Sequence, residues 1–132
     1  MSERYCLDTS ALRAFLKEEK GYEQVYSLLE LAESRAVEIF YSFMSRYELL
    51  YLSQRENKPW GRELLDFLND FNAKEIACSE EILLKAAELK AKPGKLSACD
   101  SWIAASALCA NAVLYHKDPE MDSLPVTNKN IS

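Results

Sequence analysis

Short apolar runs of strand length alternate along the chain with longer stretches in which apolar residues recur every three or four positions. The first run, residues 5–7, ends at Asp8, and helical spacing follows over residues 12–16 and 22–32. Ser10 precedes the first helical stretch and is the predicted N-cap. The pattern predicts that the chain opens with one strand and two helices.

The same alternation continues to the end of the chain. Residues 36–41 are mostly β-branched and aromatic, as strands tend to be, and lead into a helix capped by Ser42 or Ser45. The further elements expected from the pattern are helices over residues 60–71, 79–90 and 97–108, strands over 75–78 and 112–115, and a segment at 124–126 that Pro125 confines to a sheet edge.

Strands and helices in alternation, with short connections, predict a parallel sheet covered by helices on both faces. We expect a single domain over residues 1–132 with an α/β fold: a three-layer α/β/α sandwich whose mostly parallel central sheet has four to five strands. A hydrophobic fraction of 48% with 28% charged residues argues against intrinsic disorder. No repeat or linker divides the chain.

Charge and cysteine content narrow the class of protein. A net charge of −5 with one histidine counts against a broad basic surface for duplex DNA. The four cysteines lack metal-site spacing and lie in expected strands or helices, so we expect buried, free thiols and a cytoplasmic protein. Residues 1–8 lack the apolar core of a secretory signal, and residues 102–115 form too short a stretch to span a bilayer.

Four acidic residues stand beside the expected strands and helices. Asp8 and Asp118 follow strands, Asp100 lies in the first turn of a helix, and Glu48 lies on the helix after the second strand. In an open α/β sheet, functional groups gather outside the carboxyl ends of the strands. Carboxylates brought together there raise one another's pKa values unless a cation neutralises them. The sequence thus suggests a site for a hard divalent cation such as Mg²⁺, since it has no His/Cys cluster for zinc.

Each acid alone also fits a structural role. Asp8 is compatible with a turn residue, Asp100 with a capping box begun by Ser97, Glu48 with a solvated helix position, and Asp118 with a turn before a proline. Four such roles have no reason to fall around one crevice, which favours the metal site. His116, a lone histidine at a strand end, is more typical of a packed side chain than of a catalytic base.

The blocks that carry these acids resemble the conserved blocks of PIN-domain ribonucleases. Within that superfamily the chain most resembles the VapC toxins of prokaryotic VapBC toxin-antitoxin pairs. The resemblance spans essentially the whole chain, and the block around Asp100 is its most specific part. The blocks are residues 7–12, 47–49, 95–107 and 116–121.

The resemblance implies a PIN-like sandwich and a Mg²⁺- or Mn²⁺-dependent endoribonuclease that cleaves single-stranded regions of RNA. Asp8, Glu48, Asp100 and Asp118 would be the catalytic acids, with Ser10 supporting them. The reaction would be metal-assisted hydrolysis, in which Asp8, Asp100 and Asp118 ligate the metal. Glu48 would hold a metal-bound water or help to take its proton.

The last block departs from the family pattern. Many members have Thr-x-Asp-x-Asp-Phe where this chain has His-Lys-Asp-Pro-Glu-Met-Asp, so Glu120 and Asp122 are alternatives to Asp118 as the fourth acid. Basic residues near the acids in sequence are candidates to steer RNA phosphates. These are Arg13, Arg46, Lys92, Lys95 and Lys117.

The resemblance also implies a partner protein, a VapB-type antitoxin whose tail lies in a groove of the toxin. Apolar and aromatic residues of the second and third helices could serve that contact, a homodimer or the core: Tyr26, Leu29, Tyr47 and Tyr51. Two alternative functions remain. One is a PIN-like binding protein without catalytic activity. The other is a Mg²⁺-binding regulatory module of the receiver type, which predicts adjacent acids after the first strand, whereas here Thr9 and Ser10 follow Asp8.

Overall fold

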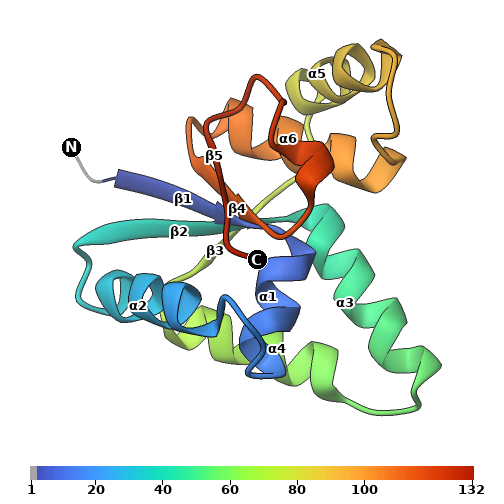
Figure 1. Ribbon diagram of the computed structural model, residues 1–132. Helices are drawn as coiled ribbons and strands as arrows, with labels where there is room; N and C mark the ends of the chain where they lie inside the picture. Colours follow the sequence, from blue (N-terminus) through green and yellow to red (C-terminus); the bar gives the residue numbers. More distant parts are fainter. Residues whose placement is uncertain (1–2) are drawn as a thin grey trace.

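Five parallel strands form the central sheet in the order β3-β2-β1-β4-β5, with helices on both faces (Figure 1). The computed structural model describes residues 3–132. The strands are β1 (Glu3–Leu7), β2 (Val37–Ser42), β3 (Lys74–Ile76), β4 (Val113–His116) and β5 (Asn128–Asn130). This confirms the predicted α/β/α sandwich and its parallel sheet.

The helices divide between the two faces of the sheet. In Figure 1, α1, α2 and α4 lie below the sheet, α5 and α6 lie above it, and α3 extends from the end of β2. The helices are α1 (Thr9–Leu16), α2 (Tyr22–Glu33), α3 (Phe43–Arg55), α4 (Trp60–Asp70), α5 (Glu80–Ala91) and α6 (Ala98–Cys109), with a short 3-10 helix η1 (Pro119–Met121). In the part of the chain described, no helix is both long and apolar enough to cross a membrane.

Successive strand residues point to opposite faces and so feed two separate cores. Leu7 and Ile39 pack with α1, α2 and α4, whereas their neighbours Cys6 and Phe40 pack with α5 and α6. Leu114 of β4 is fully buried in the second core. Because both faces are covered, the sheet is rigid enough to hold the side chains that follow its strands.

The strand order places a topological switch point between β1 and β4. From β1 the chain builds outward through β2 and β3, then returns to the other side of β1 to form β4 and β5. Ligands of open α/β sheets bind outside the carboxyl ends of the strands at such a point. The order also argues against the receiver alternative, because in the 2-1-3-4-5 order of that fold β1 lies between β2 and β3.

Several local expectations need correction. Asp8, not Ser10, is the N-cap of α1: its Oδ1 accepts a hydrogen bond from the Ala11 amide at 2.8 Å. The third strand is Lys74–Ile76 and not residues 75–78, and the edge strand begins at Asn128, beyond Pro125. The cysteines are free, but only Cys6 is buried, and Cys78 is exposed. Between the two proposed caps of α3, the Ser42 hydroxyl accepts from the Met44 amide.

Gly61 allows α4 to approach α3 closely. A Cβ at this position would lie 2.4 Å from Leu49 O and 2.5 Å from Ser53 Oγ. The nearer atom belongs to the backbone of α3, which cannot rotate away as a side chain could. The small residue therefore sets the separation of these two helices.

We predict that Gly61→Ala destabilises the protein by about 1–3 kcal/mol, the usual cost of overpacking. Within a helix the same change is normally stabilising by up to about 1 kcal/mol, so the sign of the effect is diagnostic. Urea unfolding followed by circular dichroism measures it, with Asp66→Ala on the exposed face of α4 as the control. A Gly61→Ala protein as stable as the wild type would contradict the close contact.

Candidate functional site

Asp8 lies at the switch point, one residue beyond β1, and is 97% buried, with 3% of its surface exposed. Its backbone amide donates to Tyr115 O at 3.1 Å, which extends the pairing of β1 with β4 by one residue. Its Oδ1 accepts from both the Ala11 amide and, at 2.7 Å, the Ser10 hydroxyl. The carboxylate is thus held at the start of α1.

Ser10 connects Asp8 to the loop after β4. While its hydroxyl donates to Asp8, the same oxygen accepts from the Lys117 amide at 3.1 Å. A hydroxyl can donate once and accept twice, so this arrangement is chemically complete. Ser10 thereby links two segments more than a hundred residues apart in sequence.

Glu48 reaches the site from α3. The Thr9 hydroxyl lies 2.6 Å from Glu48 Oε1 and 3.1 Å from Ser45 Oγ. The Thr9 hydroxyl is the donor in both contacts, and since it has one proton, the shorter contact to the carboxylate is the dominant one. Sequence reasoning had not singled out Thr9, whose only signal was its position directly after Asp8.

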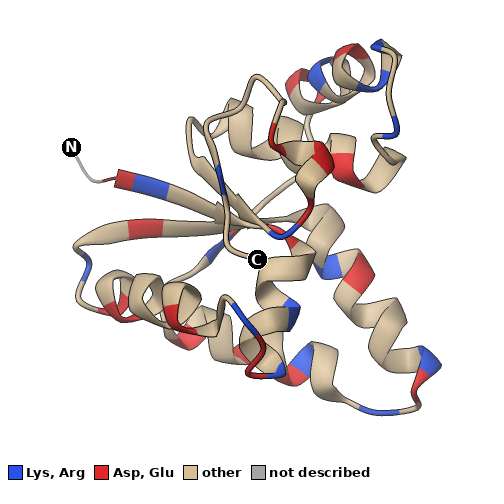
Figure 2. Cartoon of the chain, viewed as in Figure 1, with Lys and Arg blue, Asp and Glu red and all other residues tan. Residues whose placement is uncertain are grey.

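Asp100 and Asp118 occupy the starts of helical turns. Ser97 caps α6 and accepts from the Asp100 amide, as the capping-box spacing predicted. Asp118 caps η1 and accepts from the Glu120 amide at 2.9 Å. Figure 2 shows acidic segments on η1 and at the adjacent start of α6. The turn role considered for Asp118 is therefore real, whereas α6 is capped by Ser97, and within residues 3–132 no backbone amide bonds to the Asp100 carboxylate.

The acids influence one another's ionisation. The pKa of Asp8 is raised from 3.8 to about 7 overall: burial raises it most, hydrogen bonds from Ala11 and Ser10 and the nearby His116 lower it, and Asp100 raises it. Burial also raises the pKa of Asp100, which a hydrogen bond with Ser97 lowers and the charges of Asp118 and Glu120 raise further.

Glu48 belongs to the same electrostatic group. Its pKa is raised by burial, lowered by the Thr9 hydrogen bond, raised by Asp100 and lowered by Arg13. Asp100 thus interacts electrostatically with Asp8, with Glu48 and with the two acids of the loop after β4, Asp118 and Glu120.

His116 anchors the loop that carries Asp118. The Asp118 amide donates to His116 Nδ1 at 3.1 Å, so the ring proton lies on Nε2, which donates to Asn128 Oδ1 at 2.8 Å. The side chain is completely buried. Both ring nitrogens serve the β4 end and the edge strand β5, which confirms a packed, hydrogen-bonded histidine.

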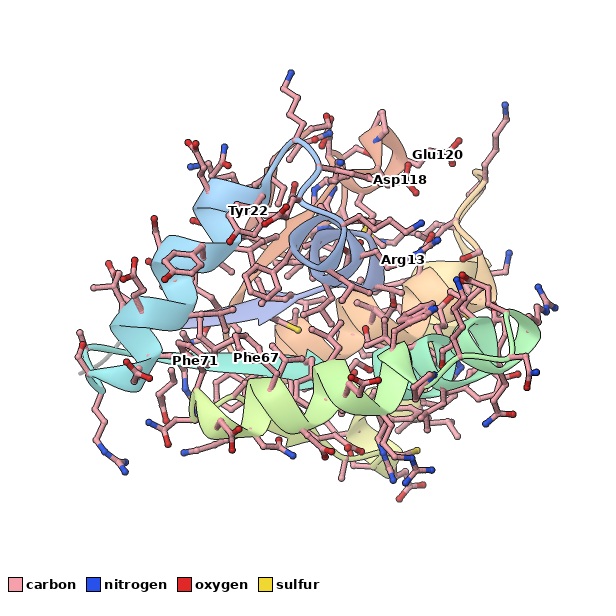
Figure 3. All side chains as sticks on the ribbon, turned by 90° about the horizontal axis from the view of Figure 1, so that it is seen from below. Arg13, Tyr22, Phe67, Phe71, Asp118 and Glu120 are labelled. Carbon is pink, nitrogen blue, oxygen red and sulfur yellow. The ribbon has the colours of Figure 1, made fainter. Side chains whose placement is uncertain are left out.

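The alternatives for the fourth acid separate in space. Asp122 Oδ1 faces His116 Nε2 at 3.6 Å and accepts from the Asn130 side chain, so it belongs to the β5 side of the loop. Asp118 and Glu120 are the two acids of this loop that act on Asp100. Figure 3 shows them on the same side of the molecule.

The candidate basic residues do not form one group. Arg13 acts on Glu48 and lines a pocket with Lys117. Arg46 instead faces Glu75 at 3.7 Å, in a different pocket, and Lys92 and Lys95 are exposed in the loop between α5 and α6. The structure therefore brings together two of the five candidates.

The donor set fits a hard divalent cation by its chemistry. It offers carboxylate oxygens from separate elements, and each charge penalises its neighbours, a penalty that a cation would relieve. Across residues 3–132, however, no three His, Cys, Asp or Glu side chains are arranged closely enough to form a finished metal centre. The acids share an electrostatic environment, without converging on one point in this arrangement.

Comparison with known proteins identifies the family of this fold and site. Residues 5–126 match the model of the PIN domain. The chain belongs to the PIN domain family. A search of curated protein sequences found no match.

Several solved structures similar to this PIN domain are structures of VapBC proteins. VapBC2 from Rickettsia felis, bound to a promoter DNA fragment, aligns with a TM-score of 0.80 and 22% identity over 98% of this chain and 99% of that chain. DNA-bound VapBC from Salmonella typhimurium aligns with a TM-score of 0.72 and 16% identity over 100% of both chains. VapBC-1 from nontypeable Haemophilus influenzae aligns with a TM-score of 0.66 and 18% identity over 96% of this chain and 97% of that chain. At these identities the likeness concerns the fold.

The raised pKa of Asp8 predicts a specific pH dependence. The folded protein binds a proton at Asp8 more readily than the unfolded chain, so this residue lowers the free energy of unfolding as pH rises from about 4 to about 7. Asp8→Asn, measured in EDTA, should be more stable than the wild type by roughly 2–4 kcal/mol at pH 8 and nearly equal to it at pH 4. Urea unfolding at several pH values measures the difference, and Asp66→Asn controls for loss of a surface charge. A difference that does not change with pH would contradict the burial of an ionisable Asp8.

The two hydrogen bonds of His116 can be separated by substitution. His116→Asn keeps an acceptor near Nδ1 for the Asp118 amide, whereas His116→Gln keeps a donor near Nε2 for Asn128. Both should cost roughly 1–3 kcal/mol of stability because ring atoms are lost from a buried position. Amide hydrogen exchange should show the Asp118 amide protected in the Asn variant only, and the Ile131 amide, which pairs with His116 O, better protected in the Gln variant. Equal protection in both variants would rule out this division of roles.

Proposed function

We propose that this PIN domain is a metal-dependent endoribonuclease that cleaves single-stranded regions of RNA and acts as the toxin of a VapBC-type pair. The observation that carries the proposal is the acid group at the switch point. Asp8, Glu48, Asp100 and Asp118 come from four different elements and are electrostatically coupled through Asp100. Burial is the largest cause of the raised pKa values of Asp8, Glu48 and Asp100, and repulsion adds to it, so the group is suited to chemistry that needs a cation.

Asp8, Asp100 and Asp118 are the residues proposed to hold Mg²⁺ or Mn²⁺. When bound, the cation would neutralise phosphate charge and supply a hydrolytic water of lowered pKa. Asp100 lies in the first turn of α6, where the helix dipole favours the ionised carboxylate that coordination requires. Ser10 orients Asp8 from one side, and the Ala11 amide orients it from the other.

Glu48 is proposed to act on the attacking water. Thr9 holds one of its oxygens, which leaves the carboxyl group oriented with the other oxygen available. Its raised pKa brings proton uptake closer to neutral pH, where a general base is most effective. The hydrogen bond from Thr9 thus serves to position a proton acceptor.

A VapB-type antitoxin is the proposed protein partner, supported by the complexes in which the similar structures occur. An open apolar pocket of about 430 Å³ between α1, α2 and α4 suits a partner segment. Phe15 lies at the centre of its aromatic wall, stacked on the rings of Tyr22 and Phe67 at centroid distances of 5.3 and 5.6 Å. Figure 3 shows Tyr22 and Phe67 on the side of α1 away from Arg13. Glu18 and Glu63 on the lining favour a basic partner.

The residues considered earlier for partner contact divide between surface and core. Tyr26 and Tyr47 are exposed and available, whereas Leu29 is buried in the first core and serves the fold. The rings of Tyr47 and Tyr51 have centroids 5.1 Å apart and are tilted by 55°, and Arg55 lies over the Tyr51 ring. These side chains give α3 an aromatic face for a proposed homodimer. Free cysteines, with Cys78 exposed, support a location in the reducing cytoplasm.

Cleavage assays test the proposed activity. The purified protein should cleave structured RNA within its single-stranded loops when Mg²⁺ or Mn²⁺ is present and should not cleave it in EDTA. Asp8→Asn and Asp100→Asn should each reduce the rate by at least about 100-fold, because each removes a metal-ligating charge. Asp66→Asn, a surface acid on α4, is the matched control and should cleave normally.

The same assays separate the alternatives. Cleavage that persists in EDTA or in both Asn variants would overturn the proposed mechanism. A protein that gains thermal stability with Mg²⁺ but cleaves no RNA would be a binding protein that retains the pocket. The stabilisation by Mg²⁺ should itself disappear in Asp8→Asn.

A further inference from the structure

A basic pocket lies beside the acid group, on one face of α1. Ser10, Arg13 and Lys17 follow one another at spacings of three and four residues, so they form a single row along the helix. With Glu19 and Lys117 they line a pocket of about 210 Å³. Three cationic side chains and one carboxylate give it a positive balance, in a chain whose net charge is −5.

Arg13 has an unmet hydrogen-bonding capacity in this pocket. Within residues 3–132 its Nε is a buried side-chain nitrogen without a hydrogen-bond partner. A buried charged donor without a partner costs free energy, which an anionic ligand would recover. Figure 3 shows Arg13 directed toward the side of the molecule that carries Asp118 and Glu120. Arg13 therefore lies on the side of the molecule where substrate is expected.

The pocket and the acid group are joined through Ser10. Its hydroxyl donates to Asp8, and it accepts from the Lys117 amide, so one residue borders both sites. From Ser10 to Lys17 the row extends about 10 Å along the helix axis. A polynucleotide with one phosphate at the acid group can continue along this row.

We propose that Arg13, Lys17 and Lys117 form a subsite for an RNA backbone phosphate adjacent to the scissile one. The inference rests on the proposed function and assigns the direction in which the strand leaves the acid group. RNA carries a charge at every nucleotide, and the phosphate next to an acidic cluster needs cations close by. Glu19 limits the subsite, since it pairs with Lys117 at 3.7 Å and would repel the ligand.

Binding of a fluorescent single-stranded oligoribonucleotide in EDTA tests the subsite without cleavage. Arg13→Gln and Lys17→Gln should each weaken binding at least about fivefold, as expected for loss of a charge-assisted contact. The slope of log affinity against log salt should fall by about 0.7 for each lost contact. The matched control is Lys74→Gln, which removes the same charge on the edge strand β3, separated from β1 by β2.

Two further measurements locate the phosphate that the subsite binds. Glu19→Gln should strengthen RNA binding, because it removes the repelling carboxylate and frees Lys117. A single uncharged methylphosphonate linkage, moved along the oligonucleotide, should weaken binding to the wild type at one position beside the cleavage site. At that position it should have no further effect on Arg13→Gln, since the two changes remove the same contact.

The subsite is overturned if the oligonucleotide does not bind the wild type, if Arg13→Gln and Lys17→Gln bind it as the wild type does, or if Lys74→Gln weakens it equally. The last result would mean diffuse attraction without a defined pocket. The proposed function is judged separately, by cleavage with Mg²⁺. Cleavage without pocket-dependent binding defeats the subsite alone, and pocket-dependent binding without cleavage defeats the nuclease proposal alone.

Discussion

Carboxylates from four elements share one region at the carboxyl ends of β1 and β4 without converging on one point, and the backbone of this PIN domain holds them there. The Asp8 amide pairs with Tyr115 O, and the Ser10 hydroxyl joins Asp8 to the Lys117 amide. These bonds lock the end of the first strand to the end of the fourth. Asp100 and Glu48 arrive on helices packed against the same junction, so repulsion among the carboxylates cannot separate them.

The same arrangement explains why the site is poor for stability and suited to binding. Burial keeps the pKa of Asp8 near 7, which means that the folded protein loses stability when the carboxyl ionises. Two apolar cores, one on each face of the sheet, offset that loss. Sites that work against stability in this way are typical of functional positions, because the unfavourable charge becomes useful when a cation or substrate supplies its partner.

Basic residues lie beside the acids in one small pocket. α1 begins with the buried Asp8 and continues with Arg13 and Lys17 on one face, so a single helix presents an acid and two bases in succession. The apolar pocket lies on the other side of the same helix. Within an acidic chain, α1 thus carries an acid, a basic row and an apolar pocket on separate parts of its surface.

Much of this could be predicted from the sequence, because strand and helix patterns, Ser97 as a cap, Ser42 as one of two candidate caps, and the placement of acids after strands are local properties. Periodicity and capping involve residues within a few positions of one another, and they sufficed for the α/β/α architecture. The choice of Asp8 over Ser10 as the N-cap was missed because both residues are good caps, and the pairing of Ser10 with the distant Lys117 decided between them.

Only the tertiary structure decided which residues meet. The position of β4 beside β1 brings Asp118 near Asp100 and turns Asp122 toward His116 and β5, although these two aspartates are close neighbours in sequence. It also separates Arg46 from Arg13, and it buries the Arg13 Nε without a hydrogen-bond partner among residues 3–132. Strand order and side-chain direction depend on contacts between segments far apart in the chain, and no pattern within a single segment encodes them.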